Sequence, residues 1–297
     1  MKAPTRPSLR WHGGKWRLAP WIIEHFPAHR VYVEPFGGAA SVLLRKPRSY
    51  AEVYNDLDDG VVNLFTVLRD VERAPRLLEL LKSTPFARKE FFASYEVSQD
   101  PIEEARRLII RSFMGFGSDG HNRAVRTGFR AASNRSGTTP AHDWVNYPAN
   151  LKAVIERLAG VVIENRDAIE IIRQHDGHDT LFYLDPPYLP EVRSAKSRRG
   201  GGKYHTYAHE MTSQDHELLL MEIRRIKGMV VLSGYSSNLY DYILMDWERI
   251  EKQTHADGAR ARTEVLWLNA ASTDRLVQRE LGFSRRKKKH GDEDGTT

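Results

Sequence analysis

Short apolar runs rich in β-branched residues alternate along the chain with segments whose apolar positions recur every three or four residues. The runs predict buried strands and the segments predict helices. Strands are expected over residues 31–34, 52–54, 161–164, 181–184, 229–233, 248–251 and 265–268, and the clearest helices over residues 61–69, 102–113, 149–158 and 213–226. This alternation predicts an α/β fold, a Rossmann-like, seven-stranded, mostly parallel sheet with helices on both faces.

The strand and helix rhythm is interrupted between residues 85 and 148, where helical segments are joined to a stretch rich in Gly, Ser, Asn and Arg. We predict an inserted, mainly helical subdomain over 85–148, within a main domain formed by 1–84 and 149–283. Residues 190–207, with three consecutive glycines, predict a mobile loop. Residues 284–297 carry charge and glycine without apolar positions, which predicts a disordered tail.

Composition limits the class of protein. Hydrophobic residues make up 40% and charged residues 28% of the chain, as in ordinary globular proteins. No apolar run approaches the ~20 residues that span a bilayer, and the first residues lack a signal-peptide core, so we expect a cytoplasmic protein without a membrane partner. The net charge of +6 favours a polyanionic partner. The absence of cysteine excludes thiolate zinc sites and cysteine nucleophiles.

The most specific motif, Asp185, Pro186, Pro187 and Tyr188, directly follows the apolar run 181–184. Ligands of open α/β sheets bind beyond the carboxyl ends of strands, and two consecutive prolines leave carbonyls there without neighbouring amide donors. The Asp185 carboxylate and the Pro186 carbonyl would grip both hydrogens of an exocyclic adenine amine and direct its lone pair at a methyl donor, while Tyr188 stacks on the base. Taken alone, the tetrapeptide also fits an ordinary proline turn.

A glycine turn follows the first predicted strand and leads into a predicted helix; it comprises Glu34, Pro35, Phe36, Gly37 and Gly38. Such a unit begins many nucleotide sites, although the spaced three-glycine fingerprint is missing. Asn55 and Asp56 end the next strand, where a carboxylate typically holds ribose hydroxyls. Asp167 occupies the same place after the third strand. Each aspartate alone also fits a helix N-cap.

A third motif near the amino terminus comprises Trp11, His12, Gly13, Gly14 and Lys15, ahead of a predicted short helix. Two glycines and a lysine at a helix start suit an anion. A phosphate-binding P-loop is disfavoured because Trp16 stands where it needs Ser or Thr. A carboxylate, such as that of the methionine end of S-adenosylmethionine, fits better. His12 is interpreted as structural.

These motifs, in this order, resemble the Dam-like adenine-specific (N6) DNA methyltransferase family over residues 9–269. The resemblance implies S-adenosylmethionine-dependent methylation of a flipped-out adenine in double-stranded DNA, catalysis at residues 185–188 and target recognition by the insertion. Donor contacts are expected from Trp11, Gly13, Gly14, Lys15, Glu34, Pro35, Phe36, Gly37, Gly38, Asn55, Asp56, Asp167 and Asp185. The chain departs from the family at Ala39 and Ala40, where another glycine is usual.

Arginines accompany aromatic residues in the insertion, a combination suited to phosphates, base edges and base stacking. DNA contacts are predicted here for Arg111, Arg123, Arg126, Arg130 and Arg135, near Phe113, Phe116 and Phe129. Arg106 and Arg107 fit a solvated helix face instead. The loop after the catalytic motif adds Arg193, Lys196, Arg198, Arg199 and Lys203, which fit either DNA contacts or a solvated linker.

Other functions were weighed against these motifs. Cytosine carbon-5 methylation and zinc-dependent deamination require cysteine, which the chain lacks. Amino-cytosine enzymes usually begin the tetrapeptide with Ser, so Asp185 favours adenine. Methylation of RNA or of a protein amide stays open, as does a non-catalytic DNA-binding module with the same fold. We expect no metal requirement and a monomer.

Overall fold

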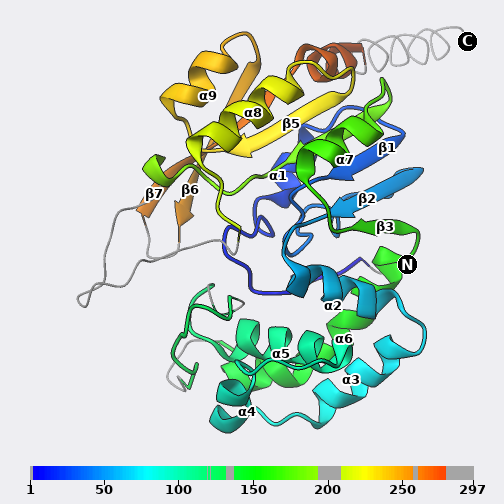
Figure 1. Cartoon of the computed structure of the whole chain (residues 1–297), viewed down its shortest axis with the longest axis vertical. Coiled ribbons are helices and arrows are strands. Elements are labelled where there is room, and N and C mark those ends of the chain that lie inside the picture. The colour runs from blue at the N-terminus through cyan, green and yellow to red at the C-terminus, as the bar shows by residue number, and fades with distance from the viewer. Residues whose placement is uncertain are drawn as a thin grey trace, which may run out of the picture.

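A computed structural model describes residues 3–118, 120, 122–131, 137–192, 209–256 and 260–278. Within these residues the chain forms one seven-stranded sheet in the order β3-β2-β1-β4-β5-β7-β6 (Figure 1). The strands are β1 (Val31–Glu34), β2 (Ala51–Asn55), β3 (Val161–Glu164), β4 (Thr180–Leu184), β5 (Met229–Gly234), β6 (Glu248–Ala256) and β7 (Arg260–Leu268). Neighbours from β3 to β5 are parallel, whereas β7 is antiparallel to both β5 and β6. The predicted α/β fold is confirmed.

Both faces of the sheet are covered, as alternation along its strands requires. Val33, Phe182 and Val230 point to one face and pack with α7 (Ala168–His175), α8 (Ser213–Ile223) and α9 (Asn238–Ile243). Tyr32 and Tyr183 point to the other face, which is covered by α1 (Ala19–Glu24), α2 (Asp59–Arg69) and their neighbours. Because β4 and β5 are buried on both faces, they read in sequence as continuous apolar runs.

Helices α3 (Arg73–Ser83), α4 (Arg88–Ala93), α5 (Pro101–Met114) and α6 (Pro140–Leu158) lie between β2 and β3 in the chain. We call residues 73–158 the helical lobe, the lower part of Figure 1. The helix expected to begin at residue 149 begins at Pro140 and passes through Pro148, so the boundary drawn between residues 148 and 149 falls inside α6. Thr139 starts this helix by accepting a hydrogen bond from the His142 amide.

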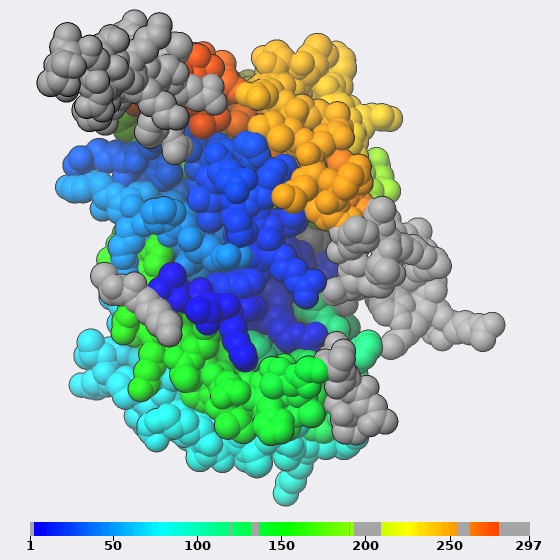
Figure 2. Space-filling model, turned by 180° about the vertical axis from the view of Figure 1, so that it is seen from behind, coloured from blue at the N-terminus to red at the C-terminus, as the bar shows by residue number. Residues whose placement is uncertain are grey.

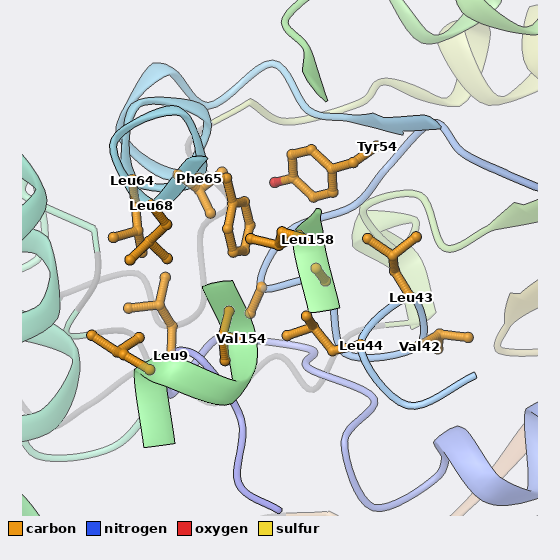
Figure 3. Close-up of a cluster of buried hydrophobic side chains, with 14 of the residues drawn as sticks. Leu9, Val42, Leu43, Leu44, Tyr54, Leu64, Phe65, Leu68, Val154 and Leu158 are labelled. Carbon is orange, nitrogen blue, oxygen red and sulfur yellow. The ribbon is translucent and has the colours of Figure 1, made fainter. Parts of the chain in front are cut away.

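The lobe shares its core with the sheet. Leu64, Phe65 and Leu68 of α2 lie beside Val154 and Leu158 of α6 (Figure 3). All five side chains are fully buried. A polar link reinforces this junction, because the Arg157 guanidinium of α6 and the Lys46 ammonium both bind the buried Glu52 carboxylate of β2. The apolar contacts and the ion cluster together hold the lobe against the sheet.

The amino-terminal segment crosses the junction between sheet and lobe (Figure 2). The Ser8 hydroxyl donates to the Ala39 carbonyl at 2.8 Å, and the Tyr147 hydroxyl of α6 donates to the Ser8 carbonyl at 2.6 Å. The Arg10 amide donates to the Ser112 hydroxyl of α5 at 2.7 Å. These bonds carry the residues that follow Arg10 to the carboxyl ends of β1 and β4. Among the described helices, none has the length and apolar character needed to cross a membrane.

Candidate active site

A cavity opens at the carboxyl ends of β1, β2 and β4. Its walls are formed by residues 11–15, 34–39, 41–42, 56–58 and 209–211, with Ala168, Tyr183, Asp185 and Pro187. All three predicted motifs therefore meet in one place, although they are widely separated in the chain. No group of three or more metal-binding side chains occurs among the described residues.

The glycine turn lies against aromatic side chains that exclude any larger residue. A Cβ atom on Gly37 would lie 2.1 Å from the Tyr54 ring, and one on Gly38 would lie 2.7 Å from Trp11 Nε1. Gly38 also has φ of +46°, in the left-handed region. The two glycines thus keep the cavity wall as bare backbone.

The predicted helix after the glycine turn is absent, and residues 38–45 form successive turns instead. Ala40 has φ of 54°, a left-handed conformation that interrupts a right-handed helix. Ala40 is one of the two positions where the Dam-like family usually has glycine, and here the chain accepts a strained alanine.

Asp56 is the acidic residue that closes the cavity beside this turn. Its carboxylate accepts hydrogen bonds from the Gly38 amide at 2.7 Å and the Asp58 amide at 2.8 Å. Burial raises the pKa of Asp56 to about 6, although both backbone bonds lower it. Each oxygen accepts only one of these bonds, so acceptor capacity is left for a ligand in the cavity.

Glu34, at the end of β1, is a fully buried carboxyl group in the same wall. Its Oε2 atom accepts from the Tyr32 hydroxyl at 2.9 Å and the Leu43 amide at 3.0 Å. Burial outweighs these bonds and raises the pKa of Glu34 to about 8. At neutral pH the group is therefore mainly protonated and adds little negative charge to the cavity.

Two residues predicted to hold the donor form hydrogen bonds within the fold. Asn55 is fully buried, and its amide nitrogen donates to the carbonyls of Pro35 and Arg166 while its oxygen accepts from the Arg166 amide. Asp167 is exposed and caps α7 by accepting from two backbone amides. Neither residue lines the cavity. This corrects the prediction for the fully buried Asn55, whereas a donor contact from the exposed Asp167, whose neighbour Ala168 lines the cavity, stays a prediction.

Lys15 and Asp185 form a buried ion pair in the cavity, with 2.8 Å between Lys15 Nζ and Asp185 Oδ1. The predicted anion site at a helix start is not formed, because α1 begins only at Ala19 and the ammonium is turned to Asp185. Burial raises the pKa of Asp185 to about 6; Lys15 lowers it and Glu264 raises it further. Asp185, the first residue of the tetrapeptide 185–188, is therefore mostly ionised at neutral pH.

Tyr188 is half-buried and fixed on several sides. Its hydroxyl donates to Glu264 Oε1 at 2.8 Å, Lys15 Nζ lies 4.7 Å from its ring centroid, and the Tyr235 ring lies at 4.4 Å. Sequence patterns did not single out Glu264 or Tyr235, nor the cavity residues Leu57, Asp58 and 209–211. A glutamate beside an apolar strand run was a signal for Glu264, whereas residues 209–211 carried none.

The structure separates the predicted DNA contacts into buried and exposed groups. Arg111 is buried and donates to the Ser94 carbonyl, and burial lowers its pKa to about 10. It stabilises the lobe, which corrects its assignment to DNA. Arg123 forms an ion pair with Glu104, and Arg130 donates to the Phe113 carbonyl at 3.2 Å. Arg126 is exposed and lies over the Tyr95 ring.

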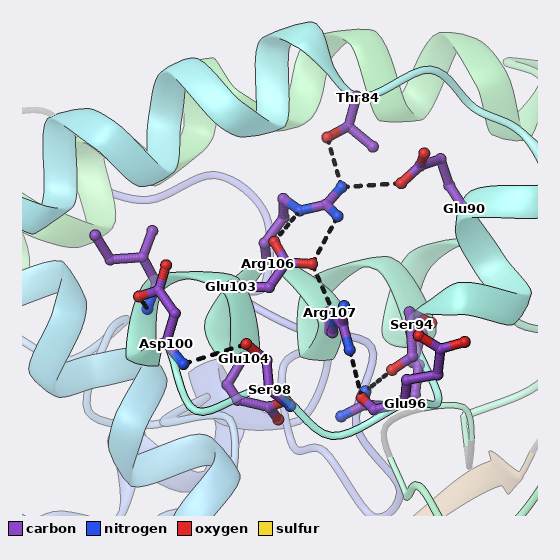
Figure 4. Close-up of polar contacts among 12 residues, drawn as sticks. Thr84, Glu90, Ser94, Glu96, Ser98, Asp100, Glu103, Glu104, Arg106 and Arg107 are labelled. Atoms are coloured by element: carbon purple, nitrogen blue, oxygen red, sulfur yellow. Dashed lines mark hydrogen bonds and ion pairs between the residues drawn. The ribbon is translucent and has the colours of Figure 1, made fainter.

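The aromatic residues divide in the same way. Phe113 packs on Tyr147 and Phe129 on Phe86, whereas Phe116 is 67% exposed. Arg106 and Arg107 bind Glu103 and other groups of the lobe, as Figure 4 shows. The predicted tail, most of the predicted loop and the remaining predicted DNA contacts lie outside the described residues. These contacts are Arg135, Arg193, Lys196, Arg198, Arg199 and Lys203.

The fold and the cavity, with the Asp-Pro-Pro-Tyr segment beside it, are typical of a class of protein, the methyltransferases. Residues 11–257 match the model of the D12 class N6 adenine-specific DNA methyltransferases, and the chain belongs to this family. It is 35% identical over 229 residues to a DNA adenine methylase of Serratia marcescens, covering 71% of this chain and 75% of that protein.

Two further relatives are more distant. A DNA adenine methylase of Escherichia coli (strain K12) is 26% identical over 220 residues, covering 71% of this chain and 74% of that protein. The type II methyltransferase M.MjaIII of Methanocaldococcus jannaschii is 27% identical over 207 residues, covering 63% and 70%.

Proposed function

We propose that this chain methylates the N6 amine of a flipped-out adenine in double-stranded DNA, with residues 185–188 as the catalytic corner and S-adenosylmethionine as the donor. One observation carries the proposal. Asp185, an ionised acceptor at neutral pH, lines the same cavity as the bare glycine turn and the Asp56 carboxylate. An acceptor for the amine and a pocket for the donor therefore share one space.

The residues of the cavity fit this donor. S-adenosylmethionine supplies a methyl group on a positively charged sulfonium. The carboxylates of Asp56, Asp58 and Asp185 in the wall favour a cation, and the indole of Trp11 and the ring of Phe36 offer apolar surface to an adenine ring. Asp56 would accept from ribose hydroxyls, and the absence of side chains at the glycine turn allows close approach of the ligand.

Asp185 and the Pro186 carbonyl would accept one hydrogen bond each from the two hydrogens of the target amine. This grip directs the nitrogen lone pair into the cavity, where the methyl group is presented. As the nitrogen–methyl bond forms, the sulfur–methyl bond breaks and the nitrogen becomes positively charged. Asp185 stabilises that charge and accepts the proton that the product amine releases, a role suited to a pKa of about 6.

The helical lobe and the segments near it would contact DNA. Phe116 and Arg126 both follow α5 and are exposed, which supports a role for this part of the lobe at the duplex. Arginine would bind phosphates, and an exposed phenylalanine would pack against bases. DNA contacts from Arg135 and from the basic residues between positions 193 and 203 stay a prediction from the sequence.

Replacing Asp185 tests the proposal, with Asp274→Ala as the matched control because Asp274 is exposed and does not line the cavity. Asp185→Ala should lower single-turnover methylation of duplex DNA by on the order of a hundredfold or more. Asp185→Asn should be nearly as inactive, because its amide hydrogens would face those of the amine. Both should still bind S-adenosylmethionine in calorimetric titration and unstack 2-aminopurine at the target position.

Methylation near the parent rate in Asp185→Ala would contradict the proposed corner. RNA and protein-amide methylation are tested by offering duplex DNA, RNA and protein with labelled donor, where label confined to DNA is expected. A non-catalytic module would bind DNA and transfer no label. Single-molecule sequencing of DNA from expressing cells would then give the methylated base and its sequence context.

A further inference from the structure

Glu264 of β7 is a buried carboxylate beside the catalytic corner, with 2% of its surface exposed. Two hydroxyls donate to its Oε1 atom, that of Tyr188 at 2.8 Å and that of Ser233 of β5 at 2.7 Å. The same oxygen lies 3.7 Å from Lys15 Nζ. One carboxylate oxygen therefore connects the catalytic tetrapeptide, the sheet and the amino-terminal segment.

The position of Glu264 would ordinarily suit an apolar side chain. The next residues of β7, from Val265 to Leu268, are fully buried and pack in the core. Burying a carboxylate there is unfavourable unless its partners compensate for the lost water. Tyr188, Ser233 and Lys15, which contact this carboxylate, all belong to, or adjoin, the proposed site.

We propose that Glu264 is a positioning residue for methyl transfer, which holds the Tyr188 ring and the Lys15 ammonium in place beside Asp185. This inference rests on the proposed role of residues 185–188. The hydrogen bond to Glu264 fixes the outer end of the Tyr188 ring, while its backbone is fixed by the two prolines before it. A ring held at both ends is ready to receive a base without losing rotational freedom on binding.

Glu264 also affects the charge of the acceptor. Asp185 is surrounded by Lys15, Glu264, Glu34 of β1, Tyr183 of β4 and Tyr240 of α9. Of these, Lys15 lowers the pKa of Asp185 and Glu264 raises it. Burial is the main cause of the raised pKa of Asp185, and Glu264 raises this pKa further, against the effect of the ammonium that the two carboxylates share.

Glu264→Gln is the informative variant, because it keeps the size of the side chain and an oxygen that can accept from Tyr188, but removes the charge. We expect unchanged affinity for S-adenosylmethionine, within about twofold, and kcat lowered roughly tenfold to a hundredfold. The acid limb of the pH–rate profile should move to lower pH, because the charge that raises the pKa of Asp185 is gone. A merely structural glutamate would not shift that limb.

Tyr188→Phe removes the hydrogen bond that Glu264→Gln only weakens by removing the charge, and it keeps the test open if Glu264→Gln does not fold. It should also lower kcat, and the double variant should lose less than the product of the two single losses, since both changes act on one hydrogen bond. Thr263→Val is the control on the same strand, because Thr263 Oγ1 accepts an exposed hydrogen bond from Gln253 and Thr263 does not line the cavity.

The outcomes separate this inference from the proposed function. If Asp185→Ala is inactive while Glu264→Gln keeps the parent kcat and pH profile, Glu264 has no positioning role. Losses that multiply in the double variant would also overturn the inference. If Asp185→Ala is itself active, the proposed catalytic corner fails, whatever Glu264→Gln does.

Discussion

Removing the Lys15 ammonium should raise the pH at which the enzyme becomes active. Lys15 Nζ lies 2.8 Å from Asp185 Oδ1, and the two side chains are 5% and 17% exposed, so water screens the pair poorly. At an effective dielectric of ~20, the attraction is at most about 6 kcal/mol. In Lys15→Gln, the glutamine amide and water that enters the cavity replace much of this stabilisation of the ionised Asp185. We therefore expect the pKa of Asp185 to rise by at least one unit, about 1.4 kcal/mol.

The shift takes the pKa of Asp185 from about 6 to about 7 or higher. If only the ionised carboxylate grips the amine, the ratio of the rate at pH 9 to that at pH 6 rises from about twofold to about tenfold. This ratio is independent of any constant loss caused by moving Tyr188. Single-turnover methylation across this range measures it, and Lys152→Gln, an exposed change on α6, is the control.

The stability of the folded protein should also depend on the ionisation of Asp185. A carboxyl whose folded pKa is raised favours the folded state below its unfolded pKa, and this contribution is lost as the pH rises through the folded pKa. Between pH 5 and pH 8, the melting temperature of Lys15→Gln should therefore fall more than that of the parent.

For the rate measurement, a ratio of the rates at pH 9 and pH 6 that stays near twofold in Lys15→Gln would refute the assignment of the acid limb to Asp185.

Three further predictions concern the donor pocket, the strained turn and the DNA surface. Asp56→Ala should weaken S-adenosylmethionine binding roughly tenfold to a hundredfold in calorimetric titration while DNA affinity is kept; unchanged donor affinity would remove Asp56 from the site. Ala40→Gly should destabilise the protein by ~1 to 2 kcal/mol less than Ala39→Gly, because both lose a buried methyl but only Ala40 has φ of 54°. Equal losses in chemical denaturation would mean that the turn is not strained. DNA affinity should fall steeply with salt, and Arg126→Ala should reduce the slope by about one; an unaltered slope would place Arg126 away from phosphates.

Much of the sheet and the order of the site motifs could be predicted from the sequence. The strands β1 and β3 begin and end where their apolar runs do, and the local signal is strongest for parallel strands buried on both faces, such as β1. The hairpin of β6 and β7 is longer than the predicted apolar runs 248–251 and 265–268. β6 continues to Ala256 and β7 begins already at Arg260, because the outer residues of the two strands pair with each other. That pairing leaves no apolar period in the sequence.

The site itself was decided partly by tertiary contacts. Asn55 and Asp167 have the residue types and spacing of ligands, but neighbouring strand ends and helix amides use their polar atoms. Arg111 occupies a position on α5 that faces the interior of the packed lobe, so its side chain is buried. Local patterns specify which groups a segment offers, and only packing determines which of them remain available.

The sequence by itself determined the chemistry at the strand ends, because motifs such as residues 185–188 act through bonds within a few residues of one another. Only the tertiary structure decided how that chemistry is tuned. Glu264 and Tyr188 are separated by 76 residues, and Lys15, which contacts Asp185, comes from the amino-terminal segment. Charges this far apart in sequence affect each other only after β7 and the amino-terminal segment close around β4, since electrostatic effects depend on distance in space and on the exclusion of water.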